Sequence, residues 1–596
     1  MSTDAVSALY NQPLPADRRG PLYNAFSYPT KVSAESVALC IACHTMPGDR
    51  VLDPFGGSGT TGIAALLCER PTPKMMAMAT AIGVEPAWGR RGAVVCDISE
   101  IGSLLARVMT SPPEPAAFAA AASRVLHAAE AAAPDLYATT GPRGEPGLIR
   151  HIIWSDVVSC PACGNINTYA EVRVRYGPLR FAEQNTCACG YSGHPDDWAR
   201  LTDEHPDPWT GTAASRRRRV PWRVYGRSGG KNWSRPATSA DSRAENESAS
   251  RPAPAGPIAL LRWGDLYRSG YHRGMTHLHH LYTARNFRAL ATLWGCIENE
   301  PGGLRDSLRL LVLSYNAAHS TLMTRVVLKK NSKDFILTGA QSGVLYVSGL
   351  PVEKNVFAGV QRKIGTFKSA FELVHGTQGT VEVVTGSSTH LDLPDESIDY
   401  IFTDPPFGAN IPYSEVNQAN ELWLRQPTDN AEEAIVSPAQ GKRLSTYQSL
   451  LTSIFSEVTR VMKKEAEATI VFHSAHASVW QALATSLGDA GLMVTAASVL
   501  DKTQASFKQV NGHVAVSGDP LLRVRRAAVA ANEQPAPTIQ ELIEGIAPDS
   551  AVAEQDTKRH NERLYSQLVG TALVNGTPIT LDAKHFYAAR MKGTVQ

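Results

Sequence analysis

An acid, two prolines and an aromatic residue follow the strand-like run IDYIFT, and together they could bind an amino group. A carboxylate and a nearby backbone carbonyl are two acceptors that can take both hydrogens of such a group, and consecutive prolines restrict the loop that presents them. The aromatic ring gives a flat face on which a base extruded from a duplex can stack. The four candidate catalytic residues are Asp404, Pro405, Pro406 and Phe407. Because D-P-P also occurs by chance in turns, the pattern needs a second motif.

A glycine-rich turn early in the chain supplies that second motif. Val51 and Leu52 predict a strand, and the apolar pattern after Thr61 predicts a helix. Glycines between them let the backbone approach a ligand, and the helix start offers unpaired N–H donors. The candidate cofactor-binding residues here are Asp53, Pro54, Phe55, Gly56, Gly57, Gly59 and Thr60. The alternatives are a plain turn or a phosphate-binding loop, but no lysine follows the glycines and G-x-G-x-x-G is incomplete.

Two flanking segments extend this candidate cofactor site. Asp97 ends a second short strand, where doubly wound folds hold a carboxylate that binds ribose hydroxyls. Its distance from Asp53 in sequence is longer than usual, which an inserted loop at 70–90 would explain; the alternative is a surface acid. Tyr28 and Thr30 precede a helical pattern, and taken alone they indicate only a turn before a helix.

Four cysteines have the spacing of a metal site. They form one C-x-x-C pair and one C-x-C pair, with a glycine after each pair: Cys160, Cys163, Cys187 and Cys189. Two such knuckles suit a tetrahedral structural zinc, because the turns let backbone N–H groups point at thiolate sulfur. The second pair is one residue shorter than usual, so His194 is a possible substitute ligand. Thiols without a metal are the alternative.

A basic run mixed with aromatic residues is a candidate nucleic-acid contact. The arginines are Arg216, Arg217, Arg218 and Arg219, and tryptophan and tyrosine follow within ten residues. Such a run can follow phosphates and gain affinity by releasing counterions. The alternative is a solvated charged loop. Since the net charge of the whole chain is only +2, any attraction to phosphates has to be local.

The order of predicted elements indicates one α/β domain interrupted by an insertion. Two strands precede the insertion and five follow it, which predicts a doubly wound, seven-stranded α/β sheet. The stretch 201–256 is rich in Ser, Arg, Pro and Asn and predicts a mobile segment. The expected parts are a first α/β half at 20–110, a zinc-ribbon-like insertion at 150–200, a basic flexible segment at 201–256, a helical insertion for target recognition at 257–375, a second α/β half at 376–530 and a small helical region at 535–596.

The motifs, taken in order, resemble a known family. The glycine string resembles the S-adenosylmethionine loop of amino-methylating DNA methyltransferases, and the turn at 28–31 resembles a motif that closes over the cofactor. The series then continues with D-P-P-F-G at 404–408, P-Y-S-E at 412–415, E-L-W-L at 421–424, R-V-M-K at 460–463, F-H-S at 472–474 and QASFKQ at 504–509. This series is similar to adenine-specific DNA methylases of the N6-adenine/N4-cytosine amino type that carry a zinc-ribbon insertion.

The resemblance implies an S-adenosylmethionine-dependent enzyme that methylates N6 of adenine in double-stranded DNA, with Asp53 on the sulfonium side of the cofactor. Other subunits of a restriction or phage-defence system are the further partners it suggests. Two departures stand out: no carboxylate follows the strand at 380–385, and Phe407 stands where tyrosine is more frequent. Stacking survives the second change, whereas the first leaves contacts to the cofactor adenine unassigned.

Other functions remain open from the sequence. The same D-P-P-[FY] chemistry serves N4 of cytosine or an amino group of RNA, and a non-catalytic DNA-binding subunit of a defence complex is a rival of another class. The chain has no apolar run long enough to cross a membrane and no secretory signal pattern, so a cytoplasmic protein is expected.

Overall fold

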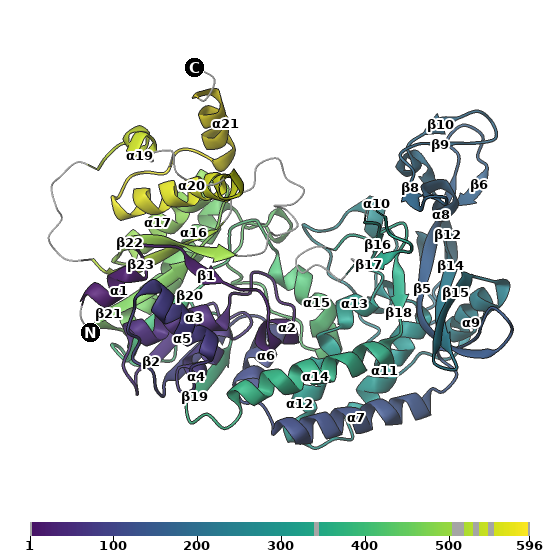
Figure 1. Ribbon diagram of the computed structural model, residues 1–596, viewed down its shortest axis with the longest axis horizontal. Coiled ribbons are helices and arrows are strands. Elements are labelled where there is room, and N and C mark those ends of the chain that lie inside the picture. The colour runs from purple at the N-terminus through teal and green to yellow at the C-terminus, as the bar shows by residue number, and fades with distance from the viewer. Residues whose placement is uncertain are drawn as a thin grey trace. The chain divides into compact units, whose positions relative to one another are not determined.

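The computed structural model describes residues 3–322, 324–329, 331–338, 345–502, 518–527, 536–545 and 554–593 (Figure 1). The chain divides into two compact units. Unit 1 comprises residues 1–112, 369–414 and 428–596, and unit 2 comprises residues 113–368 and 415–427. The QASFKQ segment of the motif series lies outside the described residues.

In the described part of unit 1, eight strands form one mixed sheet in the order β1-β22-β23-β21-β20-β2-β3-β19. The strands are β1 (Leu14–Ala16), β2 (Arg50–Asp53), β3 (Gly92–Asp97), β19 (Thr380–Thr385), β20 (Ile398–Thr403), β21 (Met462–Val471), β22 (Leu492–Lys502) and β23 (Asp519–Arg526). Only β23 runs antiparallel to its neighbours; the other pairings are parallel. The carboxyl ends of β2, β3 and β20 therefore meet at one edge, where ligands of open α/β sheets bind.

The expected count of seven strands differs from the structure by one. The two strands before the insertion and the five after it are present, and β3 pairs with β19 across the sequence gap. The additional strand is β1, which pairs with β22 at the sheet edge. Its three residues, LPA, are too few to show a periodicity, so only the pairing partner identifies them as a strand.

Most helices of unit 1 bury apolar residues in the core around this sheet. The helices of this unit are α1 (Thr3–Ala8), α2 (Pro21–Ala25), α3 (Ala34–His44), α4 (Thr60–Leu67), α5 (Pro73–Ile82), α6 (Glu100–Thr110), α16 (Leu444–Val461), α17 (Ala477–Asp489), α19 (Ile539–Gly545), α20 (Glu554–Val574) and α21 (Ala583–Gly593), with the turn η3 (Pro438–Gln440). In α16 the buried residues Tyr447, Leu451, Ile454, Phe455 and Val458 recur at helical spacing. The helix α20 packs on β22 and β23, and residues of α20 and α21 belong to the core of unit 1.

Unit 2 is built on the long strand β5 (Pro146–Ser159). Among its described residues, β5 pairs with β14 (Arg219–Ser228), β11 (Ala199–Arg200), β18 (Val352–Lys354), β4 (Ala138–Thr140) and β6 (Ile166–Thr168), and β14 pairs with β15 (Lys231–Pro236). Two-stranded ribbons are β7 (Val174–Arg175) with β8 (Arg180–Phe181), β9 (Asn185–Thr186) with β10 (Ser192–Gly193), β12 (Thr202–Pro206) with β13 (Ala213–Arg217), and β16 (Val326–Val327) with β17 (Ile336–Leu337).

The helices of unit 2 are α7 (Pro115–Ala132), α8 (Tyr169–Arg173), α9 (Ser239–Ser250), α10 (Ser269–His272), α11 (Ala284–Ile297), α12 (Gly302–Leu313) and α13 (Asn316–His319), with the turns η1 (Pro195–Asp197) and η2 (Leu278–Leu281). The helices α14 (Val356–Val374) and α15 (Tyr413–Leu424) cross the division between the units. None of the helices in the described part of the chain is long and apolar enough to span a membrane.

The segment 201–256 is not the mobile linker that its composition predicts. It folds into β12, β13, β14, β15 and α9, and β14 hydrogen-bonds to β5 along most of its length. Within it, Val224 is fully buried and Tyr225 nearly so. The prediction from composition was wrong because backbone hydrogen bonds between strands and a few buried side chains order this segment. Neither requires a long apolar run.

Candidate functional site

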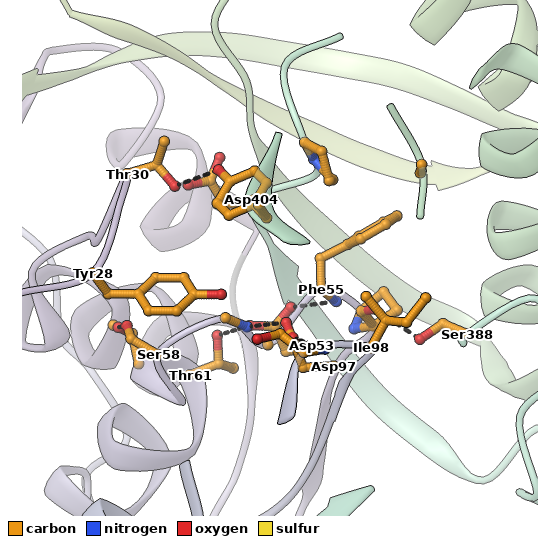
Figure 2. Close-up of a pocket in the computed structure, with 18 of the residues that line it drawn as sticks. Tyr28, Thr30, Asp53, Phe55, Ser58, Thr61, Asp97, Ile98, Ser388 and Asp404 are labelled. Carbon is orange, nitrogen blue, oxygen red and sulfur yellow. Dashed lines mark hydrogen bonds between the residues drawn. The ribbon is translucent and has the colours of Figure 1, made fainter. Parts of the chain in front are cut away.

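A pocket in unit 1 lies where β2, β3 and β20 end (Figure 2). Most of the residues predicted from sequence to bind cofactor or substrate line it: Tyr28, Thr30, Asp53, Pro54, Phe55, Gly56, Gly57, Thr60, Asp97, Asp404 and Pro406. Gly59, Pro405 and Phe407 lie next to these residues in the chain but are not part of the lining. The structure therefore brings the glycine turn and the D-P-P loop to one pocket.

Backbone geometry explains the glycines in the turn between β2 and α4. Gly57 and Gly59 have φ angles of 49° and 71°, in the left-handed region that side chains disfavour. A Cβ atom on Gly59 would lie 2.6 Å from Cα of Ala106, so the turn also packs tightly on α6. The turn brings its backbone N–H groups and the start of α4 close to the pocket. These N–H groups can donate to oxygen atoms of a ligand.

Asp53 fastens the turn to the strand that carries the D-P-P loop. Its carboxylate accepts hydrogen bonds from Oγ1 of Thr61 at 2.6 Å, from Oγ1 of Thr403 at 2.8 Å and from the backbone N–H of Phe55 at 3.1 Å. Burial raises the pKa of Asp53 to about 6, against the opposing effect of these donors. The buried carboxylate thus lies at the base of the pocket and links β2, α4 and β20.

Asp97 holds the glycine turn from the neighbouring strand. It ends β3, and its carboxylate accepts from the backbone N–H of Gly57 at 2.6 Å and of Ser99 at 2.7 Å. Asp97 lines the pocket while backbone donors hold both of its carboxylate oxygens (Figure 2). This is the position in which an acid can accept from hydroxyl groups of a ligand.

Tyr413 connects the segment around Tyr28 to the D-P-P loop. Its hydroxyl is 3.1 Å from Oγ1 of Thr30, and its ring stacks on Tyr28 with centroids 6.3 Å apart. Burial, and then the neighbouring Asp404, raise the pKa of Tyr413 well above the ordinary value. Tyr413 therefore stays protonated and joins two walls of the pocket.

The D-P-P loop is fixed from below by α16. The hydroxyl of Tyr447, which is fully buried, donates to the carbonyl oxygen of Pro406 at 2.6 Å. Phe407 is only 8% exposed and packs edge-on against Phe472, with ring centroids 5.3 Å apart. In this conformation Phe407 is a core residue and does not line the pocket.

The pocket has a strong excess of negative charge. Its described lining includes five carboxyl groups, those of Asp53, Asp97, Asp404, Glu432 and Glu433, and the single ammonium group of Lys31. Lys31 is almost buried, and its Nζ donates to the carbonyl oxygens of Leu22 and Phe26. Hydroxyl donors, first that of Ser387 and then that of Thr389, hold the pKa of Glu432 below its usual value. Such a pocket favours a ligand with positive charge.

Several lining residues were not predicted from the sequence. Ser388 donates to the carbonyl oxygen of Pro54 at 2.7 Å, and Glu433 accepts from the backbone and hydroxyl of Ser414. Tyr413 belongs to the P-Y-S-E element of the motif series, which was the one available signal. The two glutamates follow no motif and reach the pocket only because the chain folds back from unit 2 at residue 428.

The four predicted cysteine ligands come together in unit 2. Their sulfur atoms all lie within 4.8 Å of one another, and the Cys160–Cys189 and Cys163–Cys187 pairs are both 3.7 Å apart. A tetrahedron with Zn–S bonds of ~2.3 Å has S···S edges of ~3.8 Å. His194, the candidate substitute, instead accepts at Nδ1 from the N–H of Asp196, outside this group.

The four predicted nucleic-acid arginines are held in ion pairs. Arg217 and Arg219 bind the fully buried Asp156, with N···O distances of 2.7 and 2.9 Å. The other two are more exposed: Arg216 lies 3.4 Å from Asp207, and Arg218 lies 2.6 Å from Asp203. The run therefore has a fixed conformation at the junction of β13 and β14.

The α/β unit with its mixed sheet and its pocket at the strand ends fits a methyltransferase-like fold. Residues 10–94, which include the glycine turn, match the model of the family described as DNA methylase. This match supports the N6-adenine/N4-cytosine family of DNA methyltransferases, for which DNA is the implied substrate and S-adenosylmethionine the implied methyl donor. No curated protein matches the chain. The match agrees with the expectation drawn from the motif series over residues 10–94.

Proposed function

We propose that the chain is an S-adenosylmethionine-dependent methyltransferase that acts on N6 of adenine in DNA. The observation that carries the proposal is the common pocket of unit 1, where the glycine turn, Asp97 and Asp404 line one space. A methyl group can be transferred only when the bound cofactor and the bound amino group lie in contact. The presence of the glycine turn and the D-P-P loop in one pocket supports transfer between their two ligands.

The residues of the pocket suit this cofactor. S-Adenosylmethionine supplies a methyl group on a positively charged sulfonium centre. The carboxylates of Asp53, Asp97 and Asp404 favour such a cation, and Asp97 can also accept from ribose hydroxyls. We assign the remaining cofactor contacts to Tyr28, Thr30, Pro54, Phe55, Gly56, Gly57, Gly59 and Thr60. Tyr28, held by Tyr413, would cover the cofactor from one side.

The catalytic loop acts by accepting hydrogen bonds. We assign the carboxylate of Asp404 and the carbonyl of Pro405 to the two amino hydrogens of the target base, which favours a nitrogen with its lone pair directed at the methyl group. Pro406 keeps the loop rigid, and Tyr447 holds its carbonyl. Phe407 would stack on the extruded base after the loop at 408–411 opens.

Two roles are assigned to unit 2. A structural zinc bound by the four cysteines is supported by their sulfur spacing and by two matching turns. In these turns the N–H of Gly164 donates to the carbonyl oxygen of Cys160, and that of Gly190 to the carbonyl oxygen of Cys187, both at 2.9 Å. Contacts to DNA phosphates are assigned to Arg216 and Arg218, the more exposed arginines of the basic run, while Arg217 and Arg219 act mainly by neutralising Asp156.

Changing Asp53 to Asn should stabilise the protein without cofactor at neutral pH. The pKa of Asp53 is higher in the folded protein than the ordinary 3.8, so ionisation costs folding stability as pH rises from about 4, and the cost is complete above pH 6. The full cost is up to about 3 kcal/mol. Asn keeps an oxygen for Phe55 and Thr403, and the hydroxyl of Thr61 can turn to the carbonyl of Phe402 at 3.4 Å.

Urea unfolding between pH 4 and 8 measures this effect. The variant and the wild type should be equally stable near pH 4 and diverge through pH 6, while calorimetry should find S-adenosylmethionine bound at least tenfold more weakly. Asp395→Asn, at an exposed carboxylate outside the pocket, is the control for both measurements. A difference that did not depend on pH would contradict the raised pKa, and unchanged cofactor affinity would remove Asp53 from the cofactor site.

The substrate base is tested by mass spectrometry of nucleosides from DNA methylated in vitro with labelled S-adenosylmethionine. N6-methyladenine is expected, since the D-P-P-F to E-L-W-L stretch resembles adenine enzymes. N4-methylcytosine would overturn the choice of base and keep the reaction, because both are exocyclic amino groups. Label found only in RNA would overturn the DNA assignment. Cofactor binding without label in any nucleoside would favour a non-catalytic DNA-binding subunit.

A further inference from the structure

Unit 2 contains a cavity of about 530 Å³ to which the methyl-transfer step assigns no ligand. It is lined by residues of the β12–β13 ribbon, the start of β14, α9, α10 and η2. Its volume lies in the usual range of small-molecule sites, roughly 300–1,000 Å³. Among the described lining residues are five arginines and four tryptophans or tyrosines. Arginine side chains bind phosphate groups, and aromatic side chains stack on flat rings, so the two together suit a phosphorylated aromatic compound.

Asp207 organises one wall of this cavity. Its Oδ2 lies 3.0 Å from Nε2 of His279 and 2.8 Å from Nε2 of His280, and its Oδ1 accepts from the backbone N–H groups of Trp209 and Thr210. The side chains of Asp207, His279 and His280 are all buried. A carboxylate with this many donors holds the loop after β12 in place whether or not a ligand binds.

The same trio has the composition of a metal site, but hydrogen bonding excludes that use in this arrangement. Backbone N–H groups of Thr276 and His277 both donate to Nδ1 of His280. A neutral imidazole that accepts at Nδ1 carries its proton on Nε2, which then donates to Asp207 and has no lone pair for a metal. The trio is therefore a hydrogen-bonded clamp.

Three buried polar atoms of residues that line the cavity have no hydrogen-bond partner within the described part of the chain. They are Nδ1 of His279, Oε2 of Glu245 and Nη2 of Arg219. Because Asp207 can only accept, Nε2 of His279 bears the proton and its Nδ1 is an acceptor; burial lowers the pKa of His279, which favours this neutral form. Oε2 of Glu245 is 3.9 Å from Arg285, beyond hydrogen-bond distance.

Buried polar atoms are normally paired, so a ligand could complete the hydrogen bonds of these three once their side chains turn toward the cavity. Such a ligand offers N–H donors to His279 and Glu245 and an acceptor to Arg219. The edge of an amino-bearing nucleobase carries donors and acceptors side by side.

The charge of the wall points to a phosphate on the same ligand. Asp156 alone compensates both Arg217 and Arg219, which leaves one positive charge in excess. Arg200, which is 3.6 Å from Asp156, is itself neutralised by Asp196 at 3.0 Å. Guanidinium groups bind phosphate oxygens with paired N–H donors, so an anionic group at this wall would restore the balance.

We propose that this cavity of unit 2 binds a nucleotide, with the phosphate at the arginines and the base between Tyr271 and the unpaired atoms of His279 and Glu245. Tyr271 is 41% exposed and lines the cavity, so its ring is accessible for stacking. The nucleotide is either free or part of a nucleic acid, because both present the same base and phosphate. This cavity shares no lining residue with the pocket of unit 1, but two of its arginines, Arg216 and Arg218, are those assigned above to DNA phosphates.

The test is calorimetric titration with the four 2′-deoxynucleoside 5′-monophosphates at saturating S-adenosylmethionine, which keeps the pocket of unit 1 occupied. We expect one bound nucleotide per chain, with affinity at least tenfold lower in Tyr271→Ala and in Arg216→Ala. Asp207 keeps its two histidines and two backbone donors in Arg216→Ala, so thermal unfolding should find that variant folded.

Matched controls are Tyr267→Ala and Arg243→Ala. Tyr267 is 39% exposed and Arg243 is an exposed residue of α9, and neither lines the cavity. Affinity within twofold of wild type is expected for both. Inorganic phosphate alone should bind much more weakly than the nucleotides.

A duplex titration identifies the source of the nucleotide. If the monophosphates bind, the ligand is a free nucleotide. If they do not bind, but duplex affinity falls in Tyr271→Ala and not in Tyr267→Ala, the ligand is a nucleotide of the nucleic acid. Equal binding by all four variants in both titrations would overturn the proposal, and so would phosphate that binds as tightly as the nucleotides. Failure of methyl transfer with intact nucleotide binding would count against the proposed function alone.

Discussion

Replacing Asp404 with alanine is expected to lower methyl transfer by about 10³-fold or more while S-adenosylmethionine binds almost as in the wild type. The carboxylate lines the pocket at the end of β20, and its assigned contact is to the amino group in the transition state. A thousandfold loss corresponds to about 4 kcal/mol of transition-state stabilisation. Single-turnover transfer to duplex DNA and calorimetry with the cofactor measure the two effects separately.

Two variants make this prediction specific. Asp404→Asn retains a carbonyl acceptor at the same position and should transfer within about tenfold of the wild type. Asp395→Ala removes a carboxylate that is 74% exposed and outside the pocket, and it should transfer normally. Loss of cofactor binding in Asp404→Ala in parallel with activity would contradict the assignment, because the residue would then belong to the cofactor site.

Cys160→Ser is expected to remove the metal and the local fold of unit 2 around it. Cys160 is buried and directly follows β5, so the knuckle anchors the end of the strand on which unit 2 is built. Structural zinc contributes roughly 10–16 kcal/mol to the folding of small zinc-binding peptides at neutral pH, and loss of one thiolate removes much of this. Elemental analysis should find about one zinc per wild-type chain and almost none in the variant.

Hydrogen exchange separates the local effect from general unfolding. Residues 160–195 should lose protection in Cys160→Ser, while the core of unit 1 and its cofactor affinity stay unchanged. Cys296→Ser, in α11 and outside the cysteine cluster, should keep both zinc and protection. Wild-type protein purified under reducing conditions without zinc would refute the site.

The segment 201–256 and the basic run within it mark the limit of composition as a guide. Polar composition predicted mobility, yet strand pairing to β5 orders the segment. The arginines predicted to meet phosphates are paired in the fold with Asp156, Asp203 and Asp207. Asp156 and Asp203 are separated from the arginine run in the sequence. Nothing next to the run indicates that their carboxylates will neutralise its positive charge.

The sequence by itself determined the chemistry-bearing motifs and the α/β order around them. The glycine turn, the D-P-P-F loop and the cysteine knuckles are contiguous runs, and their conformations follow from local sterics that glycine and proline impose. Parallel strands separated by helices then require that the turn at 53–60 and the loop at 404–407 lie at one sheet edge. These runs also indicated a resemblance to DNA methylases, which the match over residues 10–94 supports.

Only the tertiary structure decided what joins and completes these motifs. The bond from Thr403 to Asp53, the contact of Tyr413 with Thr30, and the pairing of Arg219 with Asp156 link residues far apart in sequence. The short edge strand β1 and the cavity of unit 2 depend in the same way on partners that no local pattern contains. Burial creates the raised pKa of Asp53 and the unpaired atoms of the cavity wall, and burial is a property of the packed chain, not of any segment.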